Sequence, residues 1–351
     1  MSGRGSKKIA VIPGDGIGPE VVASALEVLE AAGARFEPVH LEIGLGRWKR
    51  TGLAMSDEDM ETIKDCDCIL FGAITTPSDP NYRSVLLRIR RELDLYANIR
   101  PFHSRDLDFI IVRENTEGLY SGLEELGQDE SRTVRIVTRR GSERIAEKAC
   151  DLAAGRRKLT IIHKSNVLKS DLLFLESCRR TAERRAVAYE DMLVDAAAYN
   201  LVRNPRRFDV MVTTNLFGDI LSDEAAGILG SLGLCASANL GRSRALFEPI
   251  HGSAPDIAGQ GIANPIGAIR SAAMMMEWLG EQETARRMEE AVQKSLEAKV
   301  LTPDLGGSFR TEDVTRAVRG GARALFLELP AGAYTIGDTV AAIGTTRPES
   351  L

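Results

Sequence analysis

The sequence alternates short apolar runs with longer segments of helical spacing. The runs are continuous, which is typical of strands buried on both faces of a sheet. They cover residues 8–12, 68–73, 109–112, 159–162 and 210–212. Helical spacing appears around residues 19–32, 56–67, 142–154, 216–233, 268–297 and 311–327. Strands that alternate with helices in this way predict an α/β fold built on a parallel sheet, to which residues 36–43 add a strand of alternating pattern.

Two stretches depart from this alternation. Residues 247–264, FEPIHGSAPDIAGQGIAN, have neither a helical nor a strand period and are rich in glycine and proline. We expect an ordered loop there, and long ordered loops in compact domains tend to bind ligands. Residues 134–138 alternate after a polar stretch, which predicts an exposed hairpin arm. Such an arm has little to bury within its own subunit and therefore indicates a partner subunit.

A glycine-rich turn, PGDGIGPE, follows the first strand. Its glycines suggest a dinucleotide fingerprint, but the G-x-G-x-x-G pattern requires a glycine where Pro19 stands. This motif therefore does not predict a Rossmann site. Proline suits the first turn of a helix, because its missing N–H needs no partner there.

Two carboxylates, Asp219 and Asp223, stand four residues apart in the segment NLFGDILSD. At that spacing both leave the same face of a helix, about one turn from each other. Taken alone, the pair also fits an ordinary solvated acidic face. Hard oxygen ligands this close suit Mg²⁺ or Mn²⁺, and Asp195 is a third carboxylate that could complete the site.

Three arginines lie among apolar residues rather than on a charged helical face: Arg90, Arg100 and Arg113. Guanidinium groups hold carboxylates in a fixed orientation, so these arginines are candidates for binding an anionic substrate. Tyr120 follows them between glycines, where it serves either core packing or proton donation. Lys164 ends a strand, which fits either a solvated terminus or a ligand site at the carboxyl edge of the sheet.

Composition narrows the class of protein. The 351 residues are 44% hydrophobic, enough for one large or two ordinary domains. The formal net charge of −5 offers no basic surface for nucleic acid. The five scattered cysteines argue against a disulfide framework, and no stretch reaches the length of a signal peptide or a membrane span. We expect a cytoplasmic protein that binds neither nucleic acid nor membrane.

The motifs together closely resemble the β-decarboxylating dehydrogenases of 2-hydroxy-3-carboxy acids, the family of isopropylmalate, isocitrate and homoisocitrate dehydrogenases. The most specific parts are RRELDLYANIRPF, NLFGDILSD and HGSAPDIAGQGIANP. The resemblance implies a non-Rossmann isocitrate/isopropylmalate dehydrogenase-like fold. It places residues 1–97 and 232–351 in a large cofactor-binding domain, and residues 98–231 in a smaller domain with the substrate and metal residues and the dimer arm. It also implies a homodimer or a dimer of dimers.

The resemblance assigns roles to matching positions. Arg90, Arg100 and Arg113 would hold the substrate carboxylates, Tyr120 would protonate the enol, and Lys164 would assist proton transfer at the 2-hydroxyl. Mg²⁺ or Mn²⁺ would be bound by Asp219 and Asp223 together with Asp195, with Lys164 and Asp195 entering from the neighbouring subunit. The cofactor residues would be His251, Gly252, Ser253, Ala254, Pro255, Asp256, Ile257 and Asn264. Asp256 favours NAD, because a carboxylate repels the 2′-phosphate of NADP, and NADP-dependent relatives tend to carry a basic residue and a tyrosine at positions 256 and 257.

The substrate side chain would be read one turn before Arg90, at Ser84, Leu86 and Leu87. Two leucines there favour the isopropyl group of 3-isopropylmalate, whereas Ser84 and the neighbouring Arg83 leave isocitrate or homoisocitrate open. Arg83 also stands where isopropylmalate dehydrogenases often carry a glutamate. Two other classes remain: a non-catalytic regulatory subunit of the same fold, and a metal-dependent binding or sugar-phosphate protein. Residues 330–351 fall outside the resemblance.

Overall fold

The computed structural model describes residues 6–79 and 81–327. The chain divides into two compact units. One comprises Met1–Leu93, Gly230–Ala238 and Arg242–Leu351, and the other Asp94–Leu229 and Asn239–Gly241. We call them the terminal unit and the central unit. Residues 330–351, to which the sequence assigned no role, lie outside the described residues.

The terminal unit is an α/β unit whose strands pair in the order β2-β1-β3-β12, always in parallel. The expected strands at 8–12 and 68–73 are confirmed. In chain order the elements are β1 (Lys7–Gly14), α1 (Gly18–Ala31), β2 (Phe36–His40), α2 (Leu45–Thr51), α3 (Asp57–Asp65), β3 (Cys68–Ala73), α4 (Val85–Glu92), β11 (Ala236–Leu240, whose last two residues belong to the central unit), β12 (Ala245–Pro249), α9 (Ile266–Trp278), α10 (Gln282–Glu297) and α11 (Thr311–Leu327).

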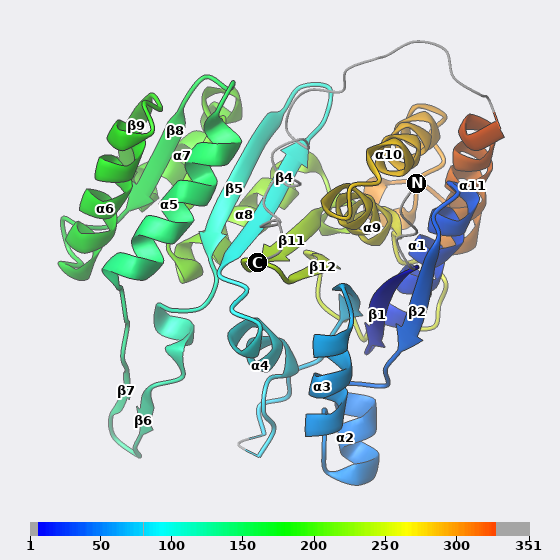
Figure 1. Ribbon diagram of the computed structural model, residues 1–351, viewed down its shortest axis with the longest axis horizontal. Coiled ribbons are helices and arrows are strands. Elements are labelled where there is room, and N and C mark those ends of the chain that lie inside the picture. The colour runs from blue at the N-terminus through cyan, green and yellow to red at the C-terminus, as the bar shows by residue number, and fades with distance from the viewer. Residues whose placement is uncertain (1–5, 80, 328–351) are drawn as a thin grey trace. The chain divides into compact units, whose positions relative to one another are not determined.

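Four helices of this unit pack on one another: α1 contacts α9 and α11, and α10 contacts α9 and α11 (Figure 1). The predicted helical region over 268–297 is confirmed, but it is divided into two helices. Gly280 adopts a positive φ of 88°, which favours glycine and ends α9 before α10 begins at Gln282. The expected loop at 247–264 also begins later, because Phe247–Pro249 complete strand β12.

The central unit is a second α/β unit. Its strands pair in the order β4-β5-β10-β8-β9, with only the β4–β5 pair antiparallel. Helices α5 and α6 pack together, and so do α7 and α8, with α8 also contacting β4 and β5. The elements are β4 (Ala97–His103), β5 (Asp108–Glu114), β6 (Glu124–Leu126), β7 (Ser131–Thr133), α5 (Arg139–Ala153), β8 (Leu159–His163), α6 (Ser170–Arg184), β9 (Tyr189–Leu193), α7 (Val194–Arg203), β10 (Val210–Thr213) and α8 (Asn215–Leu229).

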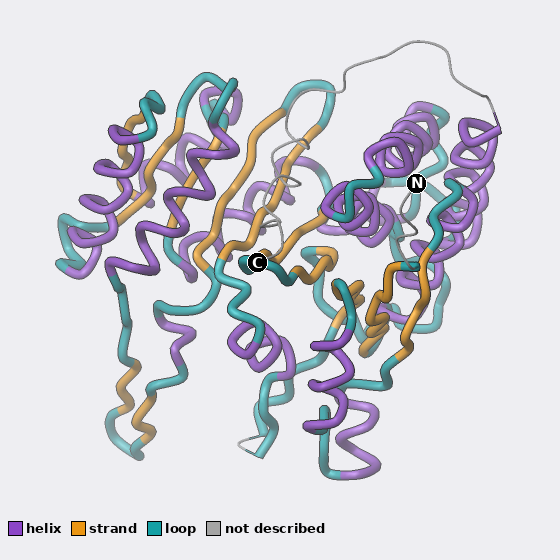
Figure 2. The backbone as a smooth tube through the Cα atoms, viewed as in Figure 1, coloured by secondary structure: helices purple, strands orange, loops and turns teal. Residues whose placement is uncertain are grey.

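A hairpin of β6 and β7 extends away from the other elements of the central unit (Figure 2). The expected arm is therefore present, but its paired residues precede the 134–138 run that predicted it. Ile136 instead bridges back to Gly118 at the base of the hairpin. All residues of β6 and β7 are exposed.

The division between the units differs slightly from the predicted one. Residues 94–97 belong to the central unit, because Ala97 begins the strand that pairs with β5 and Asp94 binds Arg144. Asn239 also belongs there, since its side-chain oxygen accepts hydrogen bonds from Asn98 and Asn115. Among the described residues, no helix is long and apolar enough to cross a bilayer.

Candidate active site

A cluster of opposite charges lies in the central unit, where helix α8 meets strands β4 and β5. Asp219 Oδ1 forms an ion pair with Arg113 and lies 3.4 Å from Arg100 Nη1, which is 3.9 Å from Asp223 Oδ1. The side chains of Arg113 and Arg100 are 3% and 6% exposed, whereas those of Asp219 and Asp223 are 35% and 61% exposed. The guanidiniums thus form the floor of the cluster and the carboxylates its open side.

The two arginines are held by polar side chains that the sequence did not single out. Arg113 donates to Asn215 Oδ1 from Nε (3.0 Å) and Nη2 (2.7 Å). Arg100 Nε donates to Asn98 Oδ1 at 2.6 Å, and its Nη1 donates to Ser222 Oγ. Asn98 precedes Arg100 by two residues and so lies on the same face of β4, a period-2 signal that could have identified it.

A glycine leaves room for this arrangement. A Cβ atom built on Gly218 would lie 2.7 Å from the Arg113 side chain, closer than unbonded carbon atoms approach. Gly218 therefore lets α8 pass close to β5 and brings Asp219 within reach of the guanidinium. Any larger side chain here would push the arginine or the helix aside.

Tyr120 joins the same cluster from the short 3₁₀ turn Leu119–Ser121. Its hydroxyl donates to Asp219 Oδ2 at 3.0 Å, and the Arg113 guanidinium carbon lies 5.5 Å from the ring centroid. The flanking Gly118 and Gly122 both have positive φ, at 85° and 73°. The turn thus aims the phenol at the acids, and the sequence-based alternative of simple core packing does not describe this half-exposed ring.

The carboxylates of the cluster have the chemistry of a site for a hard divalent cation. Burial raises the pKa of the Asp223 carboxyl above its ordinary value; the Arg100 guanidinium opposes this rise, and the Asp219 carboxylate adds to it. A cation between the two acids would stabilise both in their charged form. Carboxylate oxygens are the donors that Mg²⁺ and Mn²⁺ prefer, so Asp219 and Asp223 fit such an ion.

Lys164 and Asp195 form a second pair in the central unit. Lys164 Nζ lies 2.6 Å from Asp195 Oδ1, and this hydrogen bond lowers the pKa of Asp195. Asp171, which is fully buried, accepts the backbone N–H of Lys164 at 2.7 Å and also pairs with Arg135. The sequence did not point to Asp171. Within residues 6–79 and 81–327, no three His, Cys, Asp or Glu side chains are placed to hold one ion, so Asp195 does not join Asp219 and Asp223 in a single chain.

The remaining predicted substrate residues belong to the terminal unit. Arg90 on α4 donates to Glu248 Oε1 at 2.9 Å, and both side chains are almost fully buried. Ser84 caps the start of α4, where its Oγ accepts the Leu87 N–H at 3.4 Å. Leu86 and Leu87 are half-buried, and Arg83 is exposed. The sequence did not predict the acidic partner Glu248.

The segment 250–264, which we call the glycine-rich loop, also belongs to the terminal unit. The first part of the loop is fixed at Ser253. Its carbonyl oxygen accepts a hydrogen bond from the Ile17 N–H at 2.9 Å, and its hydroxyl accepts one from the Thr75 hydroxyl at 2.6 Å. The end of the loop is fixed at Asn264, which donates to Asp304 Oδ2 at 3.0 Å. Between these points, Asp256 is exposed and Ile257 is half-buried. Burial lowers the pKa of His251, which keeps its ring neutral at pH 7.

The turn after β1 supports this loop and also anchors neighbouring segments of the terminal unit. The Asp15 carboxylate accepts the backbone N–H groups of Leu45, Gly46 and Thr75 at 2.9, 3.1 and 3.0 Å. Those donors are therefore taken by a side chain of the same unit. A Cβ atom at Gly16 would lie 1.9 Å from the Ser253 carbonyl oxygen, so glycine lets the turn touch the loop.

Comparison with known proteins identifies the family of the chain. The family model for isocitrate/isopropylmalate dehydrogenase matches residues 8–318. The homoisocitrate dehydrogenase of Methanocaldococcus jannaschii is 45% identical over 88% of this chain and 95% of its own length. The 3-isopropylmalate/3-methylmalate dehydrogenase of the same organism is 47% identical over 89% of this chain and 99% of its own length. The crystal structure of isocitrate dehydrogenase from Methylococcus capsulatus superposes with a TM-score of 0.87 at 44% identity, covering 90% of this chain and 99% of that one.

These similarities extend over nearly the whole chain, and the relatives are all dehydrogenases. Two relatives from one organism act on different substrates by name at almost equal identity, so overall similarity does not discriminate between substrates. The chain belongs to the isocitrate/isopropylmalate dehydrogenase family and is an oxidoreductase that acts on a CH–OH group.

Proposed function

We propose that the chain catalyses the NAD-dependent, divalent-metal-dependent oxidative decarboxylation of a 2-hydroxy-3-carboxy acid, with 3-isopropylmalate as its substrate. The observation that carries the proposal is the cluster of the central unit, where Arg100 and Arg113 meet Asp219, Asp223 and Tyr120. Buried guanidiniums bind carboxylates, aspartates bind metal, and a phenol transfers a proton. The reaction requires these three functions together.

Each residue has a part in this reaction. Arg100 and Arg113 orient the substrate carboxylates, together with Arg90. Asp219 and Asp223 would hold Mg²⁺ or Mn²⁺, which would supply the Lewis acidity that the oxidation and the loss of the carboxylate require. Lys164 assists proton transfer at the 2-hydroxyl, and Tyr120 protonates C3 after carbon dioxide has left.

A second copy of the chain completes the site. Because Asp195 and Lys164 pair with each other and not with the Asp219 cluster, we assign them to the site of a partner subunit. Exposed apolar side chains of the central unit support a homodimer or a dimer of dimers. On the hairpin and at its base they are Leu123, Leu126 and Val134, and on α7 and α8 they are Tyr199, Val202 and Ile220.

The glycine-rich loop would hold the adenosine half of NAD, which would supply the hydride acceptor for C2 of the substrate. The exposed Asp256 carboxylate can accept hydrogen bonds from both ribose hydroxyls, and it would repel a 2′-phosphate. His251 and Asn264 flank the adenine. Both are fixed by hydrogen bonds within the terminal unit, His251 to the Gly252 carbonyl and Asn264 to Asp304.

The substrate side chain is assigned to the start of α4. Leu86 and Leu87 offer apolar surface, and the Ser84 hydroxyl is engaged in capping the helix. Burying two methyl groups contributes about 1.5 kcal/mol, whereas a carboxylate left unpaired beside the leucines would cost more than that. Isocitrate and homoisocitrate are the alternatives, since relatives carry both names and Arg83 and Ser84 are polar.

Steady-state kinetics with the three hydroxy acids tests the proposal. With NAD and Mg²⁺ present, we expect 3-isopropylmalate to give the highest kcat/KM, and excess EDTA to abolish turnover until Mg²⁺ or Mn²⁺ is restored. A preference of more than about tenfold for isocitrate or homoisocitrate would mean that Arg83 and Ser84 govern the pocket. Full activity in chelated, metal-stripped enzyme would refute the metal site.

A further inference from the structure

We infer that Glu20 and Thr311 form a clasp that holds the glycine-rich loop in its NAD-binding conformation, and that both are positioning residues for the dinucleotide. The inference rests on the proposed function, because it takes this loop as the NAD site. Glu20 lies in the first turn of α1, and Thr311 is the first residue of α11. Sequence reasoning gave neither residue a role in binding.

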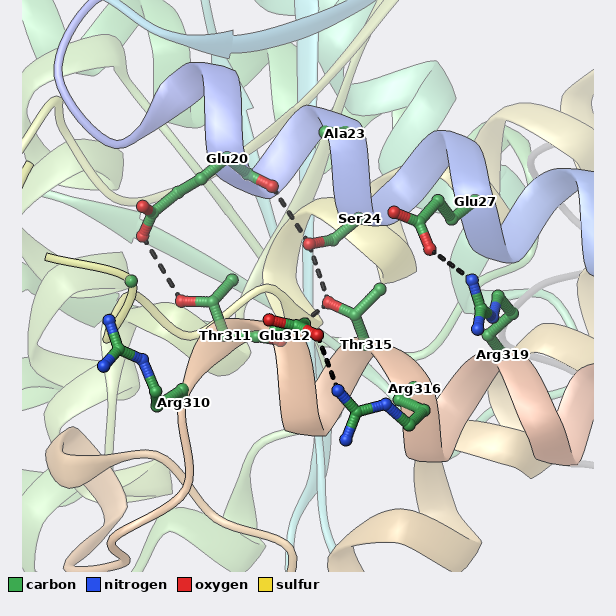
Figure 3. Close-up of a pocket in the computed structure, with 11 residues that line it drawn as sticks. Glu20, Ala23, Ser24, Glu27, Arg310, Thr311, Glu312, Thr315, Arg316 and Arg319 are labelled. Atoms are coloured by element: carbon green, nitrogen blue, oxygen red, sulfur yellow. Dashed lines mark hydrogen bonds and ion pairs between the residues drawn. The ribbon is translucent and has the colours of Figure 1, made fainter. Parts of the chain in front are cut away.

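The clasp closes on Ala263. Glu20 Oε1 accepts the Ala263 N–H at 3.2 Å, and Thr311 Oγ1 donates to the Ala263 carbonyl oxygen at 2.6 Å. Both backbone polar groups of Ala263 are thus satisfied by side chains from two different helices. Figure 3 shows the Glu20 side chain reaching from α1 toward Thr311, whose Oγ1 lies 3.3 Å from Glu20 Oε1.

Two more hydrogen bonds hold the residues just before Ala263. The Thr311 N–H donates to the Gly261 carbonyl at 2.9 Å, and Arg310 Nη2 donates to the Gln260 carbonyl at 2.8 Å. Gly261 has a positive φ of 66°, and a Cβ atom there would meet Arg310 Nη2 at 3.0 Å. The 260–263 limb has no strand or helix partner, so these side chains take the place of regular secondary structure.

The clasp lies next in sequence to the residues that the proposed function assigns to NAD, so it can fix their positions. Asn264, which flanks the adenine in the proposed function, directly follows Ala263. Asp256 and Ile257 lie between the clasp and the anchor of the loop at Ser253. Because both ends of the loop are held by hydrogen bonds, the ribose-binding residues are in place before NAD binds. Binding then costs less conformational entropy.

The clasp residues contact each other across α1 and α11, and a second hydrogen bond joins the same two helices without reaching the loop. Next to the clasp, a cavity of about 440 Å³ between α1 and α11 is lined by polar and charged side chains, Glu20 and Thr311 among them. Further along the same two helices, Thr315 Oγ1 and Ser24 Oγ form their own hydrogen bond at 2.8 Å (Figure 3). That bond links α1 to α11 without touching the loop, so Thr315→Val is a matched control for a general loss of stability.

Kinetics of single variants test the clasp. Glu20→Ala and Thr311→Val each remove one hydrogen bond to Ala263, so we expect KM for NAD to rise about tenfold in each. The kcat at saturating NAD and the KM for the hydroxy acid should stay close to wild type. Glu20→Gln and Thr311→Ser keep an acceptor and a donor, and both should restore the KM for NAD. Thr315→Val should leave it unchanged.

The outcomes separate the inference from the function on which it rests. If wild-type enzyme does not use NAD, the proposed function fails and the clasp fails with it. If wild-type enzyme uses NAD while Glu20→Ala and Thr311→Val keep the wild-type KM, the clasp alone is refuted. An equal rise in KM for Thr315→Val would also refute it, because the effect would then come from loosened helix packing. Should Glu20→Ala not fold, the Thr311→Val and Thr311→Ser pair decides the question.

Discussion

At the scale of single residues, the cluster around Asp219 buries its cations and leaves its acids partly exposed. Arg113 and Arg100 are fixed by Asn215, Asn98 and Ser222, which hold each guanidinium without neutralising it. A buried positive charge of fixed orientation suits a substrate that carries several carboxylates. Tyr120 contacts Asp219 in the same cluster, so its hydroxyl lies beside the groups to which the proposed function assigns the substrate.

Tyr120→Phe should separate the two chemical steps. The variant keeps the ring over Arg113 but removes the proton, so overall turnover should fall by about 10²- to 10⁴-fold. Reduction of the 2-oxo acid by NADH, which needs no proton at C3, should survive much better. Spectrophotometric assays of both reactions measure the ratio. Equal loss of both would indicate that the phenol packs or orients and does not transfer the proton.

Glu277 makes the free energy of unfolding depend on pH. Its carboxyl is buried in α9, burial raises its pKa to about 8, and its Oε2 atom has no hydrogen-bond partner among the described residues. The folded protein therefore holds this proton more tightly than the unfolded chain, in which the pKa is near 4.5. Unfolding releases the proton between these two pKa values, so the free energy of unfolding falls as pH rises from about 4.5 to about 8.

Glu277→Gln removes this titration, because the amide does not ionise. Urea unfolding of both proteins between pH 5 and pH 9 measures the effect. The wild type should lose stability relative to the variant by up to about 5 kcal/mol as pH rises through this window. Parallel curves for the two proteins would mean that Glu277 is already ionised in the fold.

At the scale of elements, the proposed dinucleotide-binding groups lie on a loop, and a neighbouring turn and two helices hold that loop in place. The Asp15 turn fixes Thr75 and the start of α2, and the same turn touches the glycine-rich loop through Ser253. The loop therefore has a defined conformation although it lacks a repeating pattern. We expect the charge of this loop to decide which dinucleotide the enzyme accepts.

NAD should be preferred over NADP because of Asp256. The exposed carboxylate repels a 2′-phosphate but accepts hydrogen bonds from a free ribose hydroxyl. Asp256→Asn removes the repulsion and should reduce the NAD preference, measured as the ratio of kcat/KM values, by about tenfold. Half-buried Asp313 in α11 offers a control of equal chemistry, and Asp313→Asn should not change the ratio. A wild-type enzyme that favours NADP would contradict this prediction.

At the scale of the whole molecule, the cluster around Asp219 and the Lys164–Asp195 pair belong to one central unit but not to one site. A single chain would then carry two separate parts of the active site, each incomplete by itself. Two copies related by a twofold axis would complete both sites at once, because each copy would supply Lys164 and Asp195 to the site of the other. Activity would depend on the dimer.

Mixed dimers test this sharing. Asp219→Asn and Lys164→Ala should each be inactive alone. In a dimer of one Asp219→Asn chain and one Lys164→Ala chain, one site carries both substitutions and the other carries none. After random reassociation of equal amounts, about a quarter of the wild-type activity should return. No recovery, with mixed dimers demonstrated by native mass spectrometry, would show that each chain builds its own site.

Much of this protein was determined by local sequence. The apolar runs at 68–73 and 210–212 became strands, the 311–327 pattern became α11, and the failed fingerprint at Pro19 correctly excluded a Rossmann turn. The sequence did not predict the division of the helical region at Gly280 or the end of strand β2 at His40. Helix and strand ends depend on single residues and their contacts more than on a repeating pattern. Residue types also indicated the chemistry: arginines, a carboxylate pair and a glycine-rich loop.

Only the tertiary structure decided which of these groups meet. Arg113 and Asp219 are 106 residues apart, and Arg90 and Glu248 are 158 apart, so their pairing depends on which strands and helices become neighbours. Periodicity reports the environment of each element but not the identity of its neighbours. The supporting asparagines, the clasp on Ala263 and the separation of Asp195 from Asp219 follow from that long-range packing, which is why the sequence indicated the chemistry but not its arrangement.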